Sequence, residues 1–312
     1  MNILLAVATL VGYIFIITMY SIKIIKFLRL PTHLRSEIYP FISTERSSSN
    51  DYYFKNPKRL IKPKRKDLFR RILFLLKEYV FLSDYFHQDK RYWVALHPWH
   101  IGFILIITFH IFSFFGALVT VGGIPVVPNS PFGIGIILYY LSLYLGVISF
   151  VTGLFGSIGI LILRLADKKL KDYATPLNYF TYVFLLVVFL SGLYSWYFVD
   201  PTFNDYREFW KGLITLQPTD VEPATAVHVL LFALLLIYLP FTRSLHYITR
   251  LFAFFLIRWD DEPNIRGSLL EKKIQNLLGQ RVHWSGPHIP KGVTWRDIAV
   301  EAIRQGERGK TP

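Results

Sequence analysis

Four histidines stand inside long apolar runs of this chain of 312 residues. Two of them, His100 and His110, lie in the run 98–121, and the other two, His228 and His246, lie in the run 225–257. No other apolar run of this length contains a histidine. Because burying an imidazole without a partner costs free energy, such residues are expected to form hydrogen bonds, relay protons or bind a metal.

The spacing within each pair fits two antiparallel helices. Eighteen residues separate His228 from His246, which places both rings on one helix face about 27 Å apart. Ten residues separate His100 from His110, a rise of about 15 Å with a rotation of about 80°. Antiparallel packing then sets His100 beside His246 and His110 beside His228. Two imidazoles on facing helices are the axial ligands of a low-spin b-type haem, so the spacing predicts two haems.

Pro240 interrupts the second of these runs and offers a kink that would reconcile the unequal rises. The chain contains no cysteine, which excludes disulfides, thiolate-bound iron–sulfur clusters and covalently attached haem within it. A proton channel or transporter based on histidine is the alternative from another functional class. Such relays usually combine histidine with carboxylates, and neither run contains Asp or Glu.

The elements that carry these residues are five apolar segments, 2–22, 98–121, 133–163, 177–199 and 225–257. Hydrophobic residues make up 53% of the chain, and each segment is long enough to cross a bilayer about 30 Å thick. Helices satisfy their own backbone in lipid, so we predict an all-α integral membrane protein with five transmembrane helices. The first segment lacks the basic start of a signal peptide and is interpreted as a retained helix.

Charge predicts the orientation. The net charge is +14, and residues 23–97 contain 17 Lys and Arg, whereas residues 117–135 contain none. The positive-inside rule then places the N-terminus outside and the C-terminus in the cytoplasm. Because the basic residues lie between the apolar runs, they indicate anchoring at a membrane face, and nucleic-acid binding is not expected.

Four regions are therefore expected. Residues 1–22 form the first transmembrane helix, and residues 98–257 form an antiparallel four-helix haem-binding core. Residues 23–97 form a basic cytoplasmic loop with an amphipathic helix, in which Leu68, Ile72, Leu75 and Leu76 recur at helical spacing. Residues 258–312 form a cytoplasmic tail with an amphipathic piece, "SLLEKKIQNLL", and a Gly/Pro/Trp run expected to dock on a partner subunit.

Two stretches resemble a known family. "HIGFILIITFHIFSFFG" is similar to the second-helix motif of the gamma subunit of respiratory nitrate reductase, a five-helix cytochrome b with two haems. "HVLLFALLLIYLPFTRSLH" is similar to its fifth-helix motif, and the resemblance covers about residues 98–257. It implies ligation of two haem b by His100, His110, His228 and His246, oxidation of membrane quinol near the outer haem, and delivery of electrons to a cytoplasmic iron–sulfur subunit. Arg243 is a candidate partner for a haem propionate.

The long first loop and the tail are more similar to relatives in sulfite-reduction-associated and menaquinol-oxidising complexes. The partner there resembles the catalytic subunit of heterodisulfide reductase, which implies menaquinone or another quinone as substrate and further subunits beside that partner. A gamma subunit of nitrate reductase proper is the alternative. The family's quinone site uses a lysine beyond the second helix, but no Lys or Arg occurs between His110 and Arg164. Candidate quinone residues are therefore assigned by location alone: Asn129, Ser130 and Tyr139.

Overall fold

The structure, a computed structural model, describes residues 2–28, 73, 76–77, 79–242, 246, 266–286 and 289–308. Within these ranges the chain is helical, apart from turns, loops and two isolated β-bridges. It divides into two compact units. One unit combines Met1–Tyr20 with Ile72–Ser244, and the other combines Ser21–Arg71 with Leu245–Pro312.

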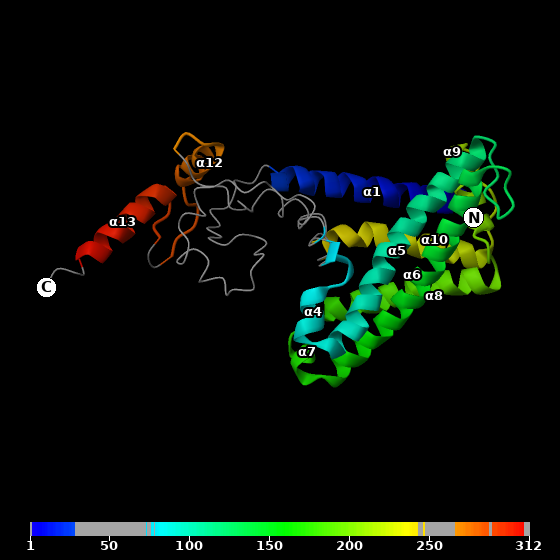
Figure 1. Cartoon of the computed structure of the whole chain (residues 1–312), viewed down its shortest axis with the longest axis horizontal. Helices are drawn as coiled ribbons and strands as arrows, with labels where there is room; N and C mark the ends of the chain where they lie inside the picture. The colour runs from blue at the N-terminus through cyan, green and yellow to red at the C-terminus, as the bar shows by residue number, and fades with distance from the viewer. Residues whose placement is uncertain are drawn as a thin grey trace. The chain divides into compact units, whose positions relative to one another are not determined.

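Five long helices dominate the described residues (Figure 1). Each is long and apolar enough to cross a membrane, which confirms the five predicted spans of a multi-pass membrane protein. Their bounds are α1 (Asn2–Leu28), α5 (Lys90–Val121), α6 (Gly133–Ala166), α8 (Pro176–Phe198) and α10 (Pro223–Tyr238).

Two predicted boundaries differ from the observed ones. Helix α5 begins well before residue 98, because the side chain of Asp89 caps it by accepting a hydrogen bond from the Tyr92 amide at 3.0 Å. At Pro240, where the sequence offers a kink in the segment 225–257, α10 gives way to a 3-10 turn, η2 (Leu239–Phe241). Proline lacks the amide proton that an α-helix requires at this position. Residues 243–245 and 247–257 lie outside the described residues.

Small residues let α5 and α6 pack closely. A Cβ atom at Gly102 would overlap the backbone of Gly153, and one at Gly159 would lie 2.9 Å from the Cβ of Ala95. Ser149 strengthens the contact by donating a hydrogen bond to the Gly102 carbonyl at 2.8 Å. Helix packing thus accounts for these glycines.

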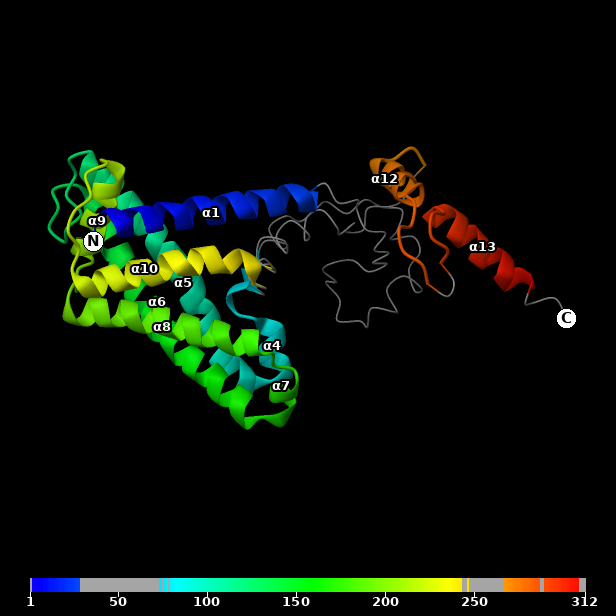
Figure 2. The ribbon, with the colours of Figure 1, turned by 180° about the vertical axis from the view of Figure 1, so that it is seen from behind.

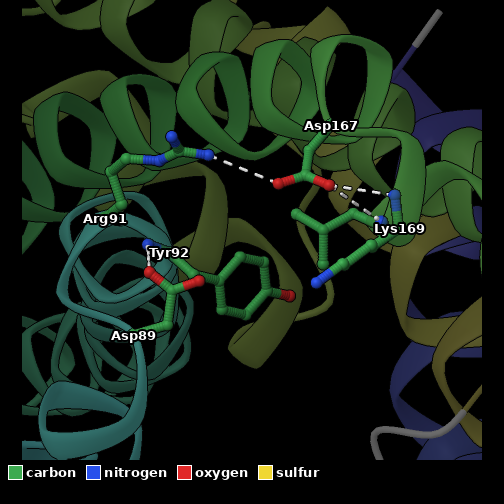
Figure 3. Close-up of polar contacts among 6 residues, drawn as sticks. Asp89, Arg91, Tyr92, Asp167 and Lys169 are labelled. Carbon is green, nitrogen blue, oxygen red and sulfur yellow. Dashed lines mark hydrogen bonds and ion pairs between the residues drawn. The ribbon is translucent and has the colours of Figure 1, made fainter.

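The short helices lie at the two ends of the bundle. Figures 1 and 2 both show α9 (Asn204–Ile214) at the end where the chain starts, and α4 (Ser83–Gln88) and α7 (Lys168–Asp172) at the opposite end. At the α7 end, Arg91 forms an ion pair with Asp167 at 3.3 Å, and Asp167 also caps α7 (Figure 3). Helices α6, α8 and α10 therefore alternate in direction between the two ends of the bundle.

Helix α9 is fixed to the bundle by its first residues. Phe203 adopts a left-handed backbone with φ of 54°, a conformation that costs roughly 1–2 kcal/mol. Its buried ring packs against Phe109 and Phe150, with ring centroids 4.7 and 6.1 Å away. The carboxylate of Asp200 accepts hydrogen bonds from the amides of Asn204 at 2.7 Å and Tyr206 at 3.1 Å. Burial of an aromatic ring and two charge-assisted bonds offset the backbone cost.

The described part of the second unit is a small helical module. The amphipathic piece predicted at "SLLEKKIQNLL" is confirmed as α12 (Leu269–Leu278), and a second helix, α13 (Trp295–Arg308), was not predicted. Single β-bridges pair Arg281 with Thr294 and Gly286 with Ile289. Of the amphipathic segment predicted in the first loop, Leu68, Ile72 and Leu75 lie outside the described residues, and Leu76 is helical and exposed.

Candidate functional site

Helices α5 and α10 bring together a buried pair of histidines, His110 and His228. Their ring centroids are 5.8 Å apart and the ring planes differ by 17°. Only 2% of His110 and 4% of His228 is exposed. These two residues are the ones that the helical spacing placed side by side.

A hydrogen bond fixes the protonation of His228. Its Nδ1 lies 3.0 Å from the Ser191 hydroxyl, and that hydroxyl lies 2.8 Å from the Val188 carbonyl. A carbonyl only accepts, so the single hydroxyl proton of Ser191 goes to Val188, and Ser191 must accept from the Nδ1–H of His228. The Nε2 of His228 consequently carries a lone pair.

His110 is held in a similar way. Its Nδ1 contacts the hydroxyl of Tyr206, which α9 delivers to the bundle. Burial raises the pKa of the Tyr206 phenol well above its ordinary value, so this group remains a neutral hydroxyl. Both histidines therefore have Nδ1 anchored by a hydroxyl from another helix.

The other ring nitrogens have no such partner. The Nε2 atoms of His110 and His228 are both buried and make no hydrogen bond within the described part of the chain. Buried polar atoms without partners are uncommon and call for an explanation. A histidine whose Nδ1 is anchored and whose Nε2 is unoccupied is arranged as a metal ligand. The pair therefore fits a metal held by two imidazoles, as in a b-type haem.

The surroundings of the pair are aromatic. Phe232 stacks on His110 with 3.4 Å between ring centroids, and Phe150 meets His228 edge-on at 5.2 Å. A Cβ atom at Gly192 would lie 2.8 Å from Cε1 of His228 and would overlap Phe150, so only glycine fits there. An apolar aromatic environment suits a flat macrocycle and excludes water from its ligands.

The two residues of the second predicted pair, His100 and His246, belong to different units of the structure. His100 places Nε2 3.0 Å from the Tyr79 carbonyl, so this nitrogen donates a proton to the backbone. His246 is helical and exposed, and it belongs to the second unit. Arg243 lies outside the described residues. Ligation by His100 and His246 stays a prediction.

The predicted quinone residues lie on and before the first turns of α6. Asn129 is exposed, and the buried Ser130 hydroxyl accepts a hydrogen bond from the Phe132 amide at 3.3 Å. The ring of Tyr139 is buried, with the guanidinium carbon of Arg207 5.7 Å from its centroid. Among these three residues, only Tyr139 contacts a charged group in the described structure.

The residues that orient the pair, Ser191 and Tyr206, were not predicted from the sequence, and neither was a role for Arg207. A signal was present in "NDYREFWKGLI", where Tyr206, Trp210 and Leu213 recur at helical spacing. This pattern indicates a helix that buries one face, and Arg207 lies next to that face.

The sequence matches the nitrate reductase gamma subunit family over residues 79–260, which is more than half of the chain. The chain belongs to this family. None of the curated proteins matches the chain.

As a member of the nitrate reductase gamma family, the chain is a membrane cytochrome b of electron transport. The family typically binds two b haems and serves as a subunit of respiratory oxidoreductase complexes. The match includes all four predicted ligands, but residues 1–78 and 261–312 lie outside it. Helix α1 and the second unit's α12 and α13 lie outside the matched residues.

Proposed function

We propose that this chain passes electrons between a membrane quinol or quinone and a cytoplasmic iron–sulfur subunit. The observation that carries the proposal is the pair His110 and His228, with both Nδ1 atoms anchored and both Nε2 atoms buried without a partner. Proton relays usually combine histidine with carboxylates, whereas the pair contacts the hydroxyls of Ser191 and Tyr206 and the rings of Phe150 and Phe232.

His110 and His228 would hold the outer haem, and His100 and His246 the inner one. When bound, the haems supply one-electron carriers toward the two ends of the bundle. Ser191 fixes the tautomer of His228, and Tyr206 orients His110. The aromatic residues exclude water, which strengthens the influence of nearby charges on the site.

We infer the orientation from charge, with the N-terminus outside, the C-terminus in the cytoplasm, and α9 on the outer side. Quinol would be oxidised at the α9 end, where Asn129, Ser130 and Tyr139 were assigned by location. Its two protons would leave to the outside. The electrons would reach the cytoplasmic face, where residues 23–97 provide 17 basic side chains.

The partner is proposed to be a cytoplasmic iron–sulfur subunit similar to the catalytic subunit of heterodisulfide reductase. The basic loop 23–97 and the tail 258–312 are the regions proposed to contact it. In the tail, Trp284 and Trp295 meet edge-on with centroids 6.3 Å apart, and 53% of Trp284 is exposed. Exposed aromatic residues amid basic charge commonly anchor protein partners.

A spectrum of the purified chain tests the haem part of the proposal. Haem b should be present at about two per chain, the stoichiometry required by four axial imidazoles, and a reduced naphthoquinol should reduce it. The variants His110→Leu and His228→Leu should lose one haem, whereas His87→Leu, an exposed histidine of α4, should keep both. An intact chain without haem would overturn the proposal.

The native complex tests the partner. A partner similar to heterodisulfide reductase predicts iron and acid-labile sulfide without molybdenum in the complex extracted from membranes. Molybdenum in stoichiometric amount would instead support the alternative, a nitrate reductase proper.

A further inference from the structure

The end of the bundle at α9 contains a buried arginine, Arg207. Only 4% of this residue is exposed, although its helix lies outside the five apolar spans. Its Nη1 lies 3.5 Å from the Ser142 hydroxyl, and its guanidinium lies over the ring of Tyr139. Its Cδ lies against Gly116 of α5, where an added Cβ would be 3.3 Å away.

The two carboxylates whose charges act on Arg207, Asp200 and Glu208, have other hydrogen-bond partners. Asp200 accepts hydrogen bonds from the amides of Asn204 and Tyr206, and Glu208 pairs with Lys211 at 2.8 Å. Within the described residues, no carboxylate forms an ion pair with Arg207. Burial lowers the pKa of Arg207, and the charge of Asp200 opposes that effect. The guanidinium nevertheless remains protonated at physiological pH.

A guanidinium has five N–H donors, and within the described residues the side chain of Arg207 makes one long hydrogen bond, to Ser142. Leaving a buried charge with so few partners costs free energy unless another group supplies acceptors. Tyr139 and Ser142 add a flat aromatic face and a hydroxyl beside it. A planar ring that carries an oxygen acceptor would satisfy both features.

We propose that Arg207 binds an oxygen of the quinol or quinone headgroup, and that Tyr139 and Ser142 line the same site. This inference rests on the proposed function, because it names the residues at which the quinone binds. Ser130 is a weaker candidate, since its hydroxyl already accepts a bond from the Phe132 amide and packs against Gly135. Asn129 is exposed and has no hydrogen bond in the described structure.

The chemistry of the headgroup matches this donor. The quinone carbonyl and the quinol oxygen both accept hydrogen bonds, and a guanidinium favours an oxygen that carries negative charge. Arg207 also follows Tyr206 directly in α9, and Tyr206 contacts His110. One short helix thus carries both the proposed headgroup ligand and the partner of a proposed haem ligand.

The test is the affinity of the full-length haem-loaded chain for a hydroxyquinoline N-oxide, a fluorescent quinol analogue with an acidic oxygen. Quenching of the probe's fluorescence on binding gives the Kd. Arg207→Gln should raise the Kd about tenfold or more, the loss expected for a charge-assisted hydrogen bond. The matched control is Lys211→Gln on the same helix, which removes a half-exposed cation paired with Glu208 and should leave the Kd unchanged.

The outcomes separate the two proposals. If the unmodified chain holds two haems but does not bind the probe, the quinone function fails, and the assignment of Arg207 fails with it. If the unmodified chain binds and Arg207→Gln binds equally well, only the assignment of Arg207 is overturned. If Arg207→Gln does not assemble, Arg207→Lys decides, because it keeps the charge but loses the fork of donors. Weaker binding by a folded Arg207→Lys supports the assignment, and unchanged binding overturns it.

Discussion

The hydroxyl of Ser191 is predicted to control how strongly His228 binds haem. Ser191→Ala removes the acceptor 3.0 Å from the Nδ1 of His228 and leaves a buried N–H without a partner. An unsatisfied buried donor costs about 1–3 kcal/mol. Loss of an outer partner of a metal-bound histidine lowers metal affinity about 10- to 100-fold. This factor corresponds to roughly 1.4–2.7 kcal/mol, so the two arguments agree.

Competition with apomyoglobin, a strong haem acceptor, measures the effect. The Ser191→Ala chain should lose one of its haems about 10 to 100 times more readily than the unmodified chain. Ser195→Ala is the matched control, because Ser195 lies one turn further along α8 and is buried, but its hydroxyl contacts Thr225 at 2.9 Å. Ser191→Thr keeps a hydroxyl and should restore retention.

Two results would refute this reasoning. If Ser191→Ala retains both haems as the unmodified chain does, the hydrogen bond does not orient the ligand. If Ser195→Ala loses haem to the same extent, the effect belongs to the packing of α8 against α10 and carries no information about His228.

Further outcomes are expected from other contacts. Tyr206→Phe should shift the midpoint potential of one haem in a redox titration, because Tyr206 contacts His110. Unchanged potentials of both haems would contradict a role of Tyr206 in orienting a haem ligand. Gly192→Leu should remove one haem by pyridine haemochrome, because its Cβ would lie 2.8 Å from the ring of His228; full retention would argue against this site. Burial raises the pKa of Asp200 in the folded chain. The free energy of unfolding should therefore decrease as the pH rises from the ordinary pKa of an aspartate to this raised pKa. Thermal unfolding of Asp200→Asn should lack that fall. Arg91→Gln breaks an exposed ion pair and should change stability by less than about 1 kcal/mol by the same method.

Hydropathy and helical geometry were sufficient to predict the five spans and the approach of His110 to His228. The spans are predictable because a long apolar stretch in lipid satisfies its backbone as a helix. The approach of the two histidines is predictable because residues on one helix lie at known angles and rises. A kink at Pro240 was expected from the residue type, but hydropathy alone gives one apolar run that continues past it. Hydropathy does not register the missing amide proton that changes α10 into η2.

The partners of the histidines could not be predicted from sequence. Ser191 is 37 residues from His228, and Tyr206 is 96 residues from His110, so only tertiary packing brings them together. Helix α13, by contrast, had a local signal. Thr294 and Asp297 form a reciprocal cap, with the Asp297 amide 3.2 Å from the Thr294 hydroxyl. This pattern indicates a helix start, but the Gly/Pro/Trp run that ends there was interpreted only as a segment that docks on a partner.

The position of α9 explains why two adjacent polar residues can serve two sites. Helix α9 is not one of the five apolar spans. The left-handed backbone at Phe203 nevertheless directs the start of α9 toward the bundle, where the ring of Phe203 packs against Phe109. From there, Tyr206 reaches His110, and Arg207 lies over Tyr139. Because both residues are carried by one rigid turn capped by Asp200, a headgroup bound at Arg207 would be held at a fixed position relative to the His110 ring. Holding two reacting groups in a fixed orientation lowers the entropic cost of the step between them.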